Sequence, residues 1–115
     1  MANSFYEDVK KYLQKGETLA VATIVATKGS TPREVGAKMV ITPWGEILGT
    51  IGGGCGEADV RQEAMEVIRT RKPKTVRVEL LDDIASDSPA VCGGIMNVFI
   101  DPWWKERDQE AVSAK

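Results

Sequence analysis

A cysteine follows three consecutive glycines in GTIGGGCGEADV, residues 49–60. Glycine has no side chain, so a ligand can lie directly against the backbone of Gly52, Gly53 and Gly54. A helical pattern begins at Glu57, and the amides at a helix N-terminus bind anions and stabilise a thiolate. We therefore expect Cys55 to be a reactive thiol beside an anion site. The alternative is a tight turn in which Cys55 fills a small apolar hole.

Two familiar phosphate-binding motifs do not match this stretch. A P-loop requires a lysine and then a serine or threonine after its last glycine, and here Gly54 is followed by Cys55 and Gly56. A dinucleotide-binding fingerprint requires a third glycine at the position of Glu57. The glycine run therefore indicates close approach of a ligand without identifying it as a nucleotide.

Two further segments carry related chemistry. KGSTPREVGAK follows an apolar strand and brings polar side chains into a loop, namely Ser30, Thr31 and Arg33. AVCGGIM again sets a thiol beside glycines, namely Cys92, Gly93 and Gly94. Each has a simpler interpretation, a solvated turn for the first and a bulge or tight bend for the second. Their common chemistry favours one shared pocket.

The elements that must position these residues follow from hydrophobic periodicity and turn residues. Ser4 and Glu7 have the spacing of a capping box, which predicts a first helix that ends at Gly16. Residues 18–27 are apolar and β-branched, which predicts a central strand covered on both faces. Further elements are expected as a hairpin over residues 37–53 that turns at Pro43 and Gly45, a helix over 57–71, and strands over 75–83 and 95–101.

These elements predict a mixed α/β (α+β) fold, a single domain with one mixed β-sheet packed by two main helices. With 115 residues the chain is long enough for one domain, which we expect to span residues 1–102 and to be followed by a C-terminal tail over 103–115. The formal net charge of −2 argues against nucleic-acid binding. We expect a cytoplasmic protein, because no apolar run could span a membrane and the N-terminus lacks a secretory signal.

The two cysteines and the absence of histidine limit the metal chemistry. A disulfide between Cys55 and Cys92 is conceivable, but a reducing compartment favours free thiols. A zinc site would need both thiols together with carboxylates or a second chain, so we expect no protein-only metal site.

The three segments resemble one family. GSTPREVGAKMVI, GTIGGGCGEADV and CGGIMNVFIDP are similar, in this order, to the N-terminal domain of the XdhC/CoxI family, accessory proteins for the maturation of xanthine dehydrogenase and related molybdenum hydroxylases. The resemblance implies a chaperone rather than an enzyme, which transiently binds the molybdenum cofactor (molybdopterin), holds it for sulfuration and delivers it to the hydroxylase. Typical members have branched apolar residues in place of Gly56 and glutamate in place of Asn97.

The resemblance and the residue chemistry together give each candidate a role. The glycines and the first helical amides would bind an anionic group, with Ser30, Thr31 and Arg33 completing the site. Cys55 would contact the metal or relay sulfur, and Cys92, Gly93 and Gly94 would form the opposite side. Glu57 would either orient a polar edge of the ligand or only place a favourable charge at the start of the helix. Family members continue into a Rossmann-like domain, so we expect a separate chain of that kind, a homo-oligomer and a sulfurtransferase among the partners.

Two other functions are compatible with the residues alone. The chain could be a dithiol sulfur carrier or redox protein that uses Cys55 and Cys92 as a pair, which requires the two sulfurs to be close enough to bridge. It could also be a non-catalytic interaction module in which the glycines only shape a surface.

Overall fold

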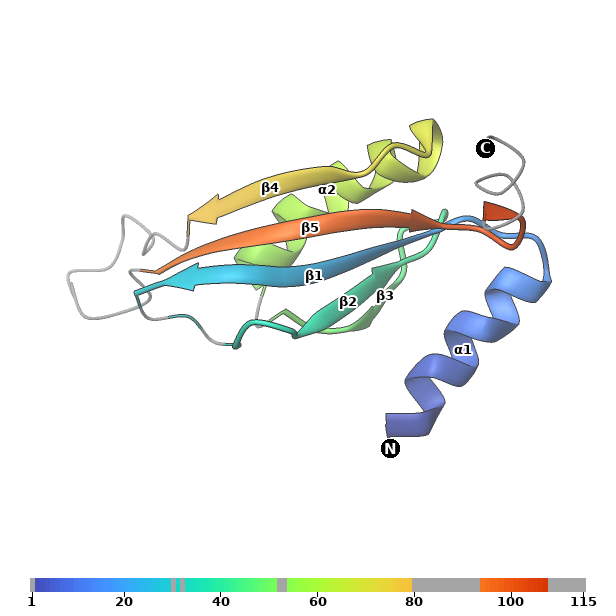
Figure 1. The fold of residues 1–115 in the computed structure, drawn as a ribbon, viewed down its shortest axis with the longest axis horizontal. Coiled ribbons are helices and arrows are strands. Elements are labelled where there is room, and N and C mark those ends of the chain that lie inside the picture. Colours follow the sequence, from blue (N-terminus) through green and yellow to red (C-terminus); the bar gives the residue numbers. More distant parts are fainter. Residues whose placement is uncertain (1, 30, 32, 52–53, 80–93, 108–115) are drawn as a thin grey trace.

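The computed structural model describes residues 2–29, 31, 33–51, 54–79 and 94–107, and only the backbone of residues 2–5, 54 and 55. These residues form two helices and a five-stranded sheet with the strand order β3-β2-β1-β5-β4 (Figure 1). The expected α+β single-domain class, with one sheet and two helices, is confirmed. The elements are α1 (Ala2–Gln14), β1 (Leu19–Lys28), β2 (Lys38–Ile41), β3 (Ile47–Gly49), α2 (Gly54–Thr70), β4 (Lys74–Glu79) and β5 (Ile95–Trp103).

The sheet differs from expectation in one respect, because its four described strand pairings are all antiparallel and the sheet is not mixed. The strands that α2 connects, β3 and β4, do run in the same direction, as in a parallel crossover unit. However, β2, β1 and β5 lie between them in the sheet. The helical connection therefore joins opposite edges of the sheet and creates no parallel pair.

Strand β1 lies at the centre of the sheet, between β2 and β5, as its apolar sequence predicts. Residues 19–22 are all buried, which requires cover on both faces. Toward the other end the strand becomes exposed, and Val25 is 48% exposed. The register with β5 shifts between Ile24 and Ala26, so Val25 forms a bulge in this ladder.

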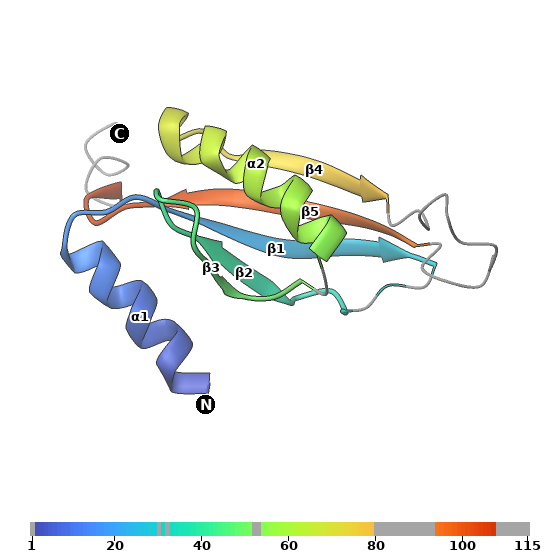
Figure 2. The same ribbon diagram turned by 180° about the vertical axis from the view of Figure 1, so that it is seen from behind.

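Helix α2 crosses one face of the sheet (Figure 2). Its buried residues Val60, Ala64 and Val67 recur at helical spacing and so form one apolar stripe. Alternate strand residues pack into the same cluster: Ala20, Ala22, Ile24, Met39, Ile41, Met96, Val98 and Ile100. This layer forms the larger hydrophobic core of the described residues.

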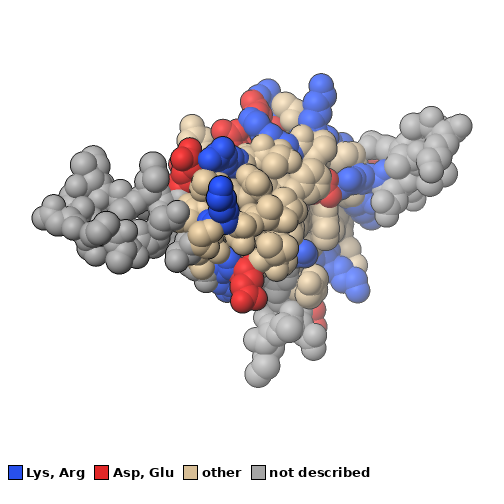
Figure 3. All heavy atoms as spheres, turned by 60° about the vertical axis from the view of Figure 1, so that its left-hand side comes forward, with Lys and Arg blue, Asp and Glu red and all other residues tan. Residues whose placement is uncertain are grey.

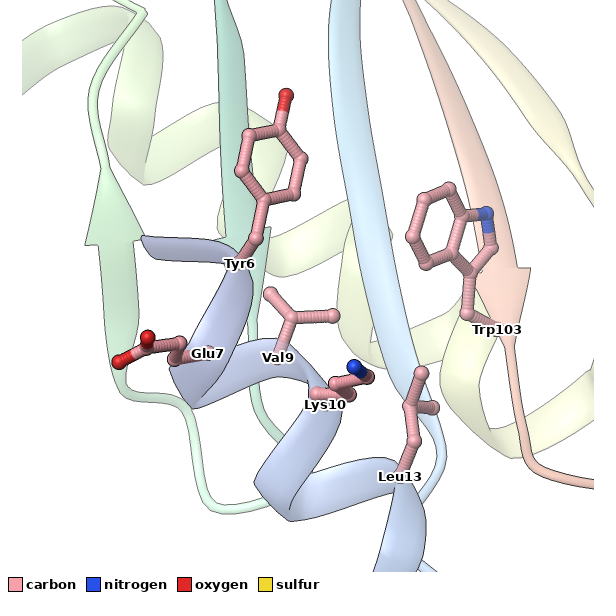
Figure 4. Close-up of a pocket in the computed structure, with 6 residues that line it drawn as sticks. All are labelled: Tyr6, Glu7, Val9, Lys10, Leu13 and Trp103. Carbon is pink, nitrogen blue, oxygen red and sulfur yellow. The ribbon is translucent and has the colours of Figure 1, made fainter. Parts of the chain in front are cut away.

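Helix α1 belongs to the opposite face and lies at the end of the sheet where β1 begins (Figure 1). There Val9 clusters with the buried side chains of Leu19, Val21 and Val40. Around Val9 and Leu13 a groove of about 380 Å³ remains, lined also by Tyr6, Glu7, Lys10 and Trp103. Figure 4 shows the Trp103 indole from β5 turned toward Val9 and Leu13.

The sequence predicts the C-terminal end of α1 correctly and its N-terminal end incorrectly. Gly16 ends the helix as expected: its φ is 89°, and the amides of Gly16 and Glu17 donate to the carbonyls of Leu13 and Tyr12 at 3.0 and 3.1 Å. These are the two hydrogen bonds of a Schellman motif. The capping-box prediction is wrong, because the helix begins at Ala2 and includes Ser4. Nothing in Ala2 or Asn3 stops a helix, and alanine favours one.

The hairpin between β2 and β3 is confirmed, with its turn at Pro43 and Gly45. The Gly45 amide donates to the Thr42 carbonyl at 2.9 Å, and Gly45 has a φ of 88°. On one side of the turn, Trp44 makes an edge-on contact with Tyr12 of α1, with ring centroids 5.3 Å apart. On the other side, the Arg61 guanidinium of α2 lies where a Gly45 side chain would be. The turn is therefore held between the two helices.

The remaining elements follow their predicted patterns with shifted ends. Helix α2 begins three residues before Glu57 and ends at Thr70. In β4, Val78 is buried and Val76 partly buried, whereas Arg77 and Glu79 are exposed, as the alternation predicts. Strand β5 extends two residues beyond the predicted end, to Trp103.

Trp104 follows β5 and packs against two cations. The Arg71 guanidinium carbon lies 4.5 Å from the centre of the Trp104 ring, and that of Arg107 lies 5.9 Å away. Arg107 also donates to the Asp101 carboxylate at 2.8 Å and to the Pro102 carbonyl at 2.7 Å. The chain is thus attached to the domain as far as Arg107.

Candidate functional site

The described ends of the three segments singled out in the sequence lie at one end of the sheet (Figure 1). Lys28 at the end of β1 pairs with Ile95 at the start of β5, so the chain leaves β1 at Gly29 beside the point where it enters β5 at Gly94. Because β3 and β1 are both antiparallel to β2, β3 also ends on this side and leads into the glycine run. A single pocket built from all three segments requires this arrangement.

The glycine run connects β3 to α2 and is anchored in the core beside it. Ile51 is fully buried in the cluster beneath α2, although it lies just before the glycines. Gly52 and Gly53 lie outside the described residues. Gly54 is the first residue of α2, so the first amides of the helix, which have no acceptor within it, belong to the glycine-rich stretch itself.

Glu57 has a defined partner within this connection. The Thr50 hydroxyl donates a hydrogen bond to the Glu57 carboxylate, which links the end of β3 to the first turn of α2 across the glycines. Glu57 is partly buried and also lies where a helix dipole favours negative charge. The sequence analysis did not identify Thr50. The feature that could have indicated it is a hydroxyl side chain before the glycines and a carboxylate after them.

The two cysteines are only partly covered by the structure. Cys55 is the second residue of α2, and its backbone is therefore in the first turn, where the helix dipole favours an anion. Its side chain, together with all of Cys92 and Gly93, lies outside the described residues. Gly94 is buried directly before β5.

The loop between β1 and β2 presents Arg33 to solvent. The Thr31 hydroxyl donates to the Arg33 carbonyl at 3.0 Å, which stabilises the backbone on both sides of residue 32. Farther along, the Gly36 amide donates to the Ile24 carbonyl at 2.8 Å and returns the chain to the sheet. Arg33 is exposed and lines a hollow of about 510 Å³ with residues 34–37. Ser30 lies outside the described residues.

Two features are absent from the described part of the chain. No group of three or more histidine, cysteine, aspartate or glutamate residues is placed there to hold a metal ion. Within the same residues, neither helix has the length and apolarity needed to cross a membrane.

The sequence matches the model of the XdhC and CoxI family over residues 12–79. This match includes β1, the β2–β3 hairpin, the glycine run, α2 and β4. The chain belongs to this family.

The chain is similar in sequence to three named proteins, two of whose names refer to xanthine dehydrogenase or to the molybdenum cofactor. The chain is 35% identical to YqeB of Escherichia coli over 97 residues, which cover 84% of the chain and 18% of that protein. It is 32% identical to a probable xanthine dehydrogenase subunit of Bacillus subtilis over 108 residues, covering 90% of the chain and 32% of the relative. It is also 32% identical to the molybdenum cofactor insertion chaperone PaoD of Escherichia coli over 65 residues, covering 56% and 20%.

A solved structure supports the fold. The chain resembles a xanthine dehydrogenase crystal structure from Bacillus halodurans with a TM-score of 0.72 and 28% identity, over 92% of this chain and 32% of the other. The chain thus spans about a third or less of the length of each of these proteins.

Proposed function

We propose that this XdhC/CoxI domain is an accessory chaperone for a molybdenum hydroxylase such as xanthine dehydrogenase, and that it binds the molybdenum cofactor transiently before insertion. Family membership supports the maturation role, and the similarity to a named insertion chaperone supports the cofactor. In this proposal the chain holds and protects its cargo, while a sulfur donor and the hydroxylase act on it.

The donor set at the loop end of the sheet fits such a ligand. The cofactor carries a terminal phosphate, a polar pterin edge and a sulfur-rich molybdenum centre. The amides that begin α2 at Gly54 suit an anionic group, and the exposed Arg33 supplies a cation at the same end of the molecule. When bound, the cofactor supplies the redox-active metal that the hydroxylase needs.

The observation that carries the proposal is that α2 begins within the glycine run and that Thr50 and Glu57 link the two sides of it. Such a link holds the amides in place before a ligand binds, which reduces the conformational entropy that the chain loses on binding. Gly52 and Gly53 complete the proposed surface. Cys55, in the first turn, is the proposed contact to the metal or relay for sulfur.

Gly54→Ala tests whether the ligand lies against the backbone. We expect the variant to melt like the parent and to lose most of its affinity in a molybdopterin titration, because one methyl group occupies the ligand's place. Gly16→Ala is the control for the binding measurement, since Gly16 lies at the end of α1, away from the proposed site, and its replacement should leave the affinity for the cofactor unchanged. Parental affinity in the Gly54 variant would contradict this site.

Arg33→Lys tests the cation. A guanidinium can form two parallel hydrogen bonds to a phosphate, which an ammonium group cannot reproduce. We expect cofactor binding to weaken by about 1–3 kcal/mol with the melting temperature unchanged. Arg69→Lys provides a control with the same chemistry, because Arg69 is exposed in the last turn of α2. An equal effect of both changes would exclude a specific role for Arg33.

Cysteine variants separate the proposal from its two alternatives. Loss of cofactor binding in Cys55→Ser, with Cys92→Ser less affected, supports a thiol contact at the start of α2. Equal dependence on both thiols, with a disulfide that forms under oxidation, would favour a dithiol sulfur carrier. Full cofactor binding without either thiol would remove the thiol role, and absence of binding in the parent would favour an interaction module.

The proposal also includes partners that this chain would need. Sulfuration requires a sulfurtransferase, and a Rossmann-like domain or a second copy of this chain would enclose the rest of the cofactor. Sedimentation of the chain with and without cofactor measures whether it assembles. A monomer that binds cofactor with full affinity would remove the requirement for a second copy.

A further inference from the structure

A hollow lies on the face of the sheet that α2 does not cover. It has a volume of about 250 Å³ and is lined by Ala26, Thr27, Lys28, Arg77, Ile95 and Asn97. Strand β5 lies between β1 and β4, so the lining comes from three adjacent strands. The hollow is near the loop end of the sheet, away from the end that α1 covers.

The bulge at Val25 gives this hollow its chemistry. Before the bulge, Ile24 pairs with Val98, and both side chains belong to the core beneath α2. After it, Ala26 pairs with Asn97 and Lys28 pairs with Ile95, so Ala26 and Lys28 lie on the opposite face. Without the extra residue the alternation would direct Lys28 to the α2 face. Bulges commonly reorient side chains beside binding sites in this way.

Three side chains with nitrogen donors line the hollow, namely Lys28, Arg77 and Asn97. Arg77 and Asn97 are paired in the β4–β5 register, and Lys28 stands on the other side of β5. Among the described residues, the side chains of Lys28 and Arg77 form no ion pair or hydrogen bond. Ala26, paired with Asn97, is small and leaves room between the two cations.

Two cations line the hollow, and none of its lining residues is a carboxylate. The nearest described carboxylate in the strand register is Glu79, which pairs with Ile95 but does not line the hollow. Figure 3, with the left-hand end of Figure 1 turned forward, shows both basic and acidic side chains around a broad uncharged area. An anion entering the hollow would meet two cations and an amide.

We propose that this hollow binds a phosphate group of a small molecule. A guanidinium fork, an ammonium group and an amide approach from different strands, and a tetrahedral phosphate offers enough oxygens to accept from all of them. The site rests on the sheet alone and is separate from the amides of α2. It therefore does not depend on the proposed cofactor function.

The experiment is an NMR titration of the ¹⁵N-labelled chain with inorganic phosphate, with sodium chloride added to keep the ionic strength constant. We expect saturable shifts of the amides of residues 26–28 and 95–97. Lys28→Gln and Arg77→Gln should each weaken binding about tenfold, the effect of one charge-assisted hydrogen bond. Asn97→Glu should abolish binding, because it places a carboxylate between the two cations.

Lys38→Gln is the matched control. Lys38 pairs with Thr23 and lies on the same face, but it does not line the hollow, so its loss removes one charge without removing a donor. Equal weakening in the Lys28, Arg77 and Lys38 variants would overturn the site, because phosphate would then be attracted by the overall charge and not bound by specific donors. Shifts confined to the start of α2 would also overturn it, as would equally tight binding of acetate at residues 26–28 and 95–97. Melting curves confirm that each variant is folded.

Discussion

The two faces of the sheet are covered in different ways. On one face, α2 lies across the strands and buries a continuous layer that includes Ile24, Met96 and Ile100. On the other, α1 covers one end through Val9, and much of the rest is exposed, including Phe99 at 37%. One face therefore has the continuous packing of a core, while the other leaves strand residues accessible.

This asymmetry separates stability from binding. Hydrophobic burial is the dominant stabilising contribution to folding, so most of it should come from the layer between α2 and the sheet. The loop end and the open face can vary in sequence at a smaller cost. Both sites proposed above lie in these regions, one at the start of α2 and one on the open face.

Adjacent residues of β5 provide the strongest test of this comparison. Ile100 is fully buried beneath α2, so Ile100→Ala should lower the free energy of unfolding by about 2–5 kcal/mol. Phe99, on the opposite face, is partly exposed, so Phe99→Ala should cost about 1 kcal/mol or less. Urea denaturation of both variants measures the difference. Equal losses would show that the open face is packed as tightly as the α2 face.

The α2 face is also the part of the fold that the sequence predicts best. Val60, Ala64 and Val67 recur at helical spacing, and an uninterrupted apolar strand before them indicates cover on both faces. Local turn chemistry at Gly16 and Gly45 is equally readable, because left-handed backbone favours glycine. These features depend on neighbours in the chain.

Other features depend on contacts between distant segments. Nothing marks Val25 as a bulge residue, since the extra residue exists only relative to β5. The hydrogen bond between Thr50 and Glu57 requires the end of β3 and the first turn of α2 to lie close together. Residue types alone indicate that the three candidate segments share one chemistry. The antiparallel arrangement of the strands explains why the described ends of these segments lie at one end of the sheet. The roles of Cys55 and Cys92 stay predictions.

The helices themselves provide a second test. Val9 of α1 and Val60 of α2 are both buried, but α1 packs on the smaller cluster. We expect α1 amides to exchange through a local opening, below the free energy of global unfolding. Val9→Ala should accelerate exchange in α1 about tenfold or more and leave β5 nearly unchanged, whereas Val60→Ala should accelerate both. Native-state hydrogen exchange measures this, and parallel acceleration in the Val9 variant would contradict it.

Two glycines with almost the same φ sharpen the comparison further. Gly16, at the end of α1, has open space where an added methyl group would lie, so Gly16→Ala should cost only backbone strain, about 1 kcal/mol. At Gly45 an added methyl would lie 2.6 Å from the Arg61 guanidinium of α2. Gly45→Ala should therefore cost slightly more, and Arg61→Ala should remove the excess. A double-mutant cycle by thermal unfolding measures the coupling, and zero coupling would mean that Arg61 moves freely.

The smallest effect is expected at an exposed ion-pair cluster between α2 and β4. The Lys74 ammonium donates to the carboxylates of Glu63 and Glu66, the latter at 2.8 Å. Its hydrogen bond to Glu63, and then that to Glu66, raise the pKa of Lys74 above 10.5. The hydrogen bond from Lys74 in turn lowers the pKa of Glu66 below 4.5.

The pH dependence of stability follows from the direction of these two shifts. Because the Lys74 pKa is raised on folding, its contribution is complete below pH 10.5 and is lost as the pH rises through the folded value. Because the Glu66 pKa is lowered, its contribution is complete above pH 4.5 and is lost as the pH falls through the folded value.

Lys74→Gln should therefore lower the melting temperature slightly at neutral pH, by an amount that shrinks in acid and at high salt. Arg69→Gln, which removes only a 3.7 Å pair to the same Glu66 carboxylate, should have still less effect. A Lys74 effect that persists unchanged at pH values well below 4.5 would assign it to the packing of the side-chain stem instead of its charge.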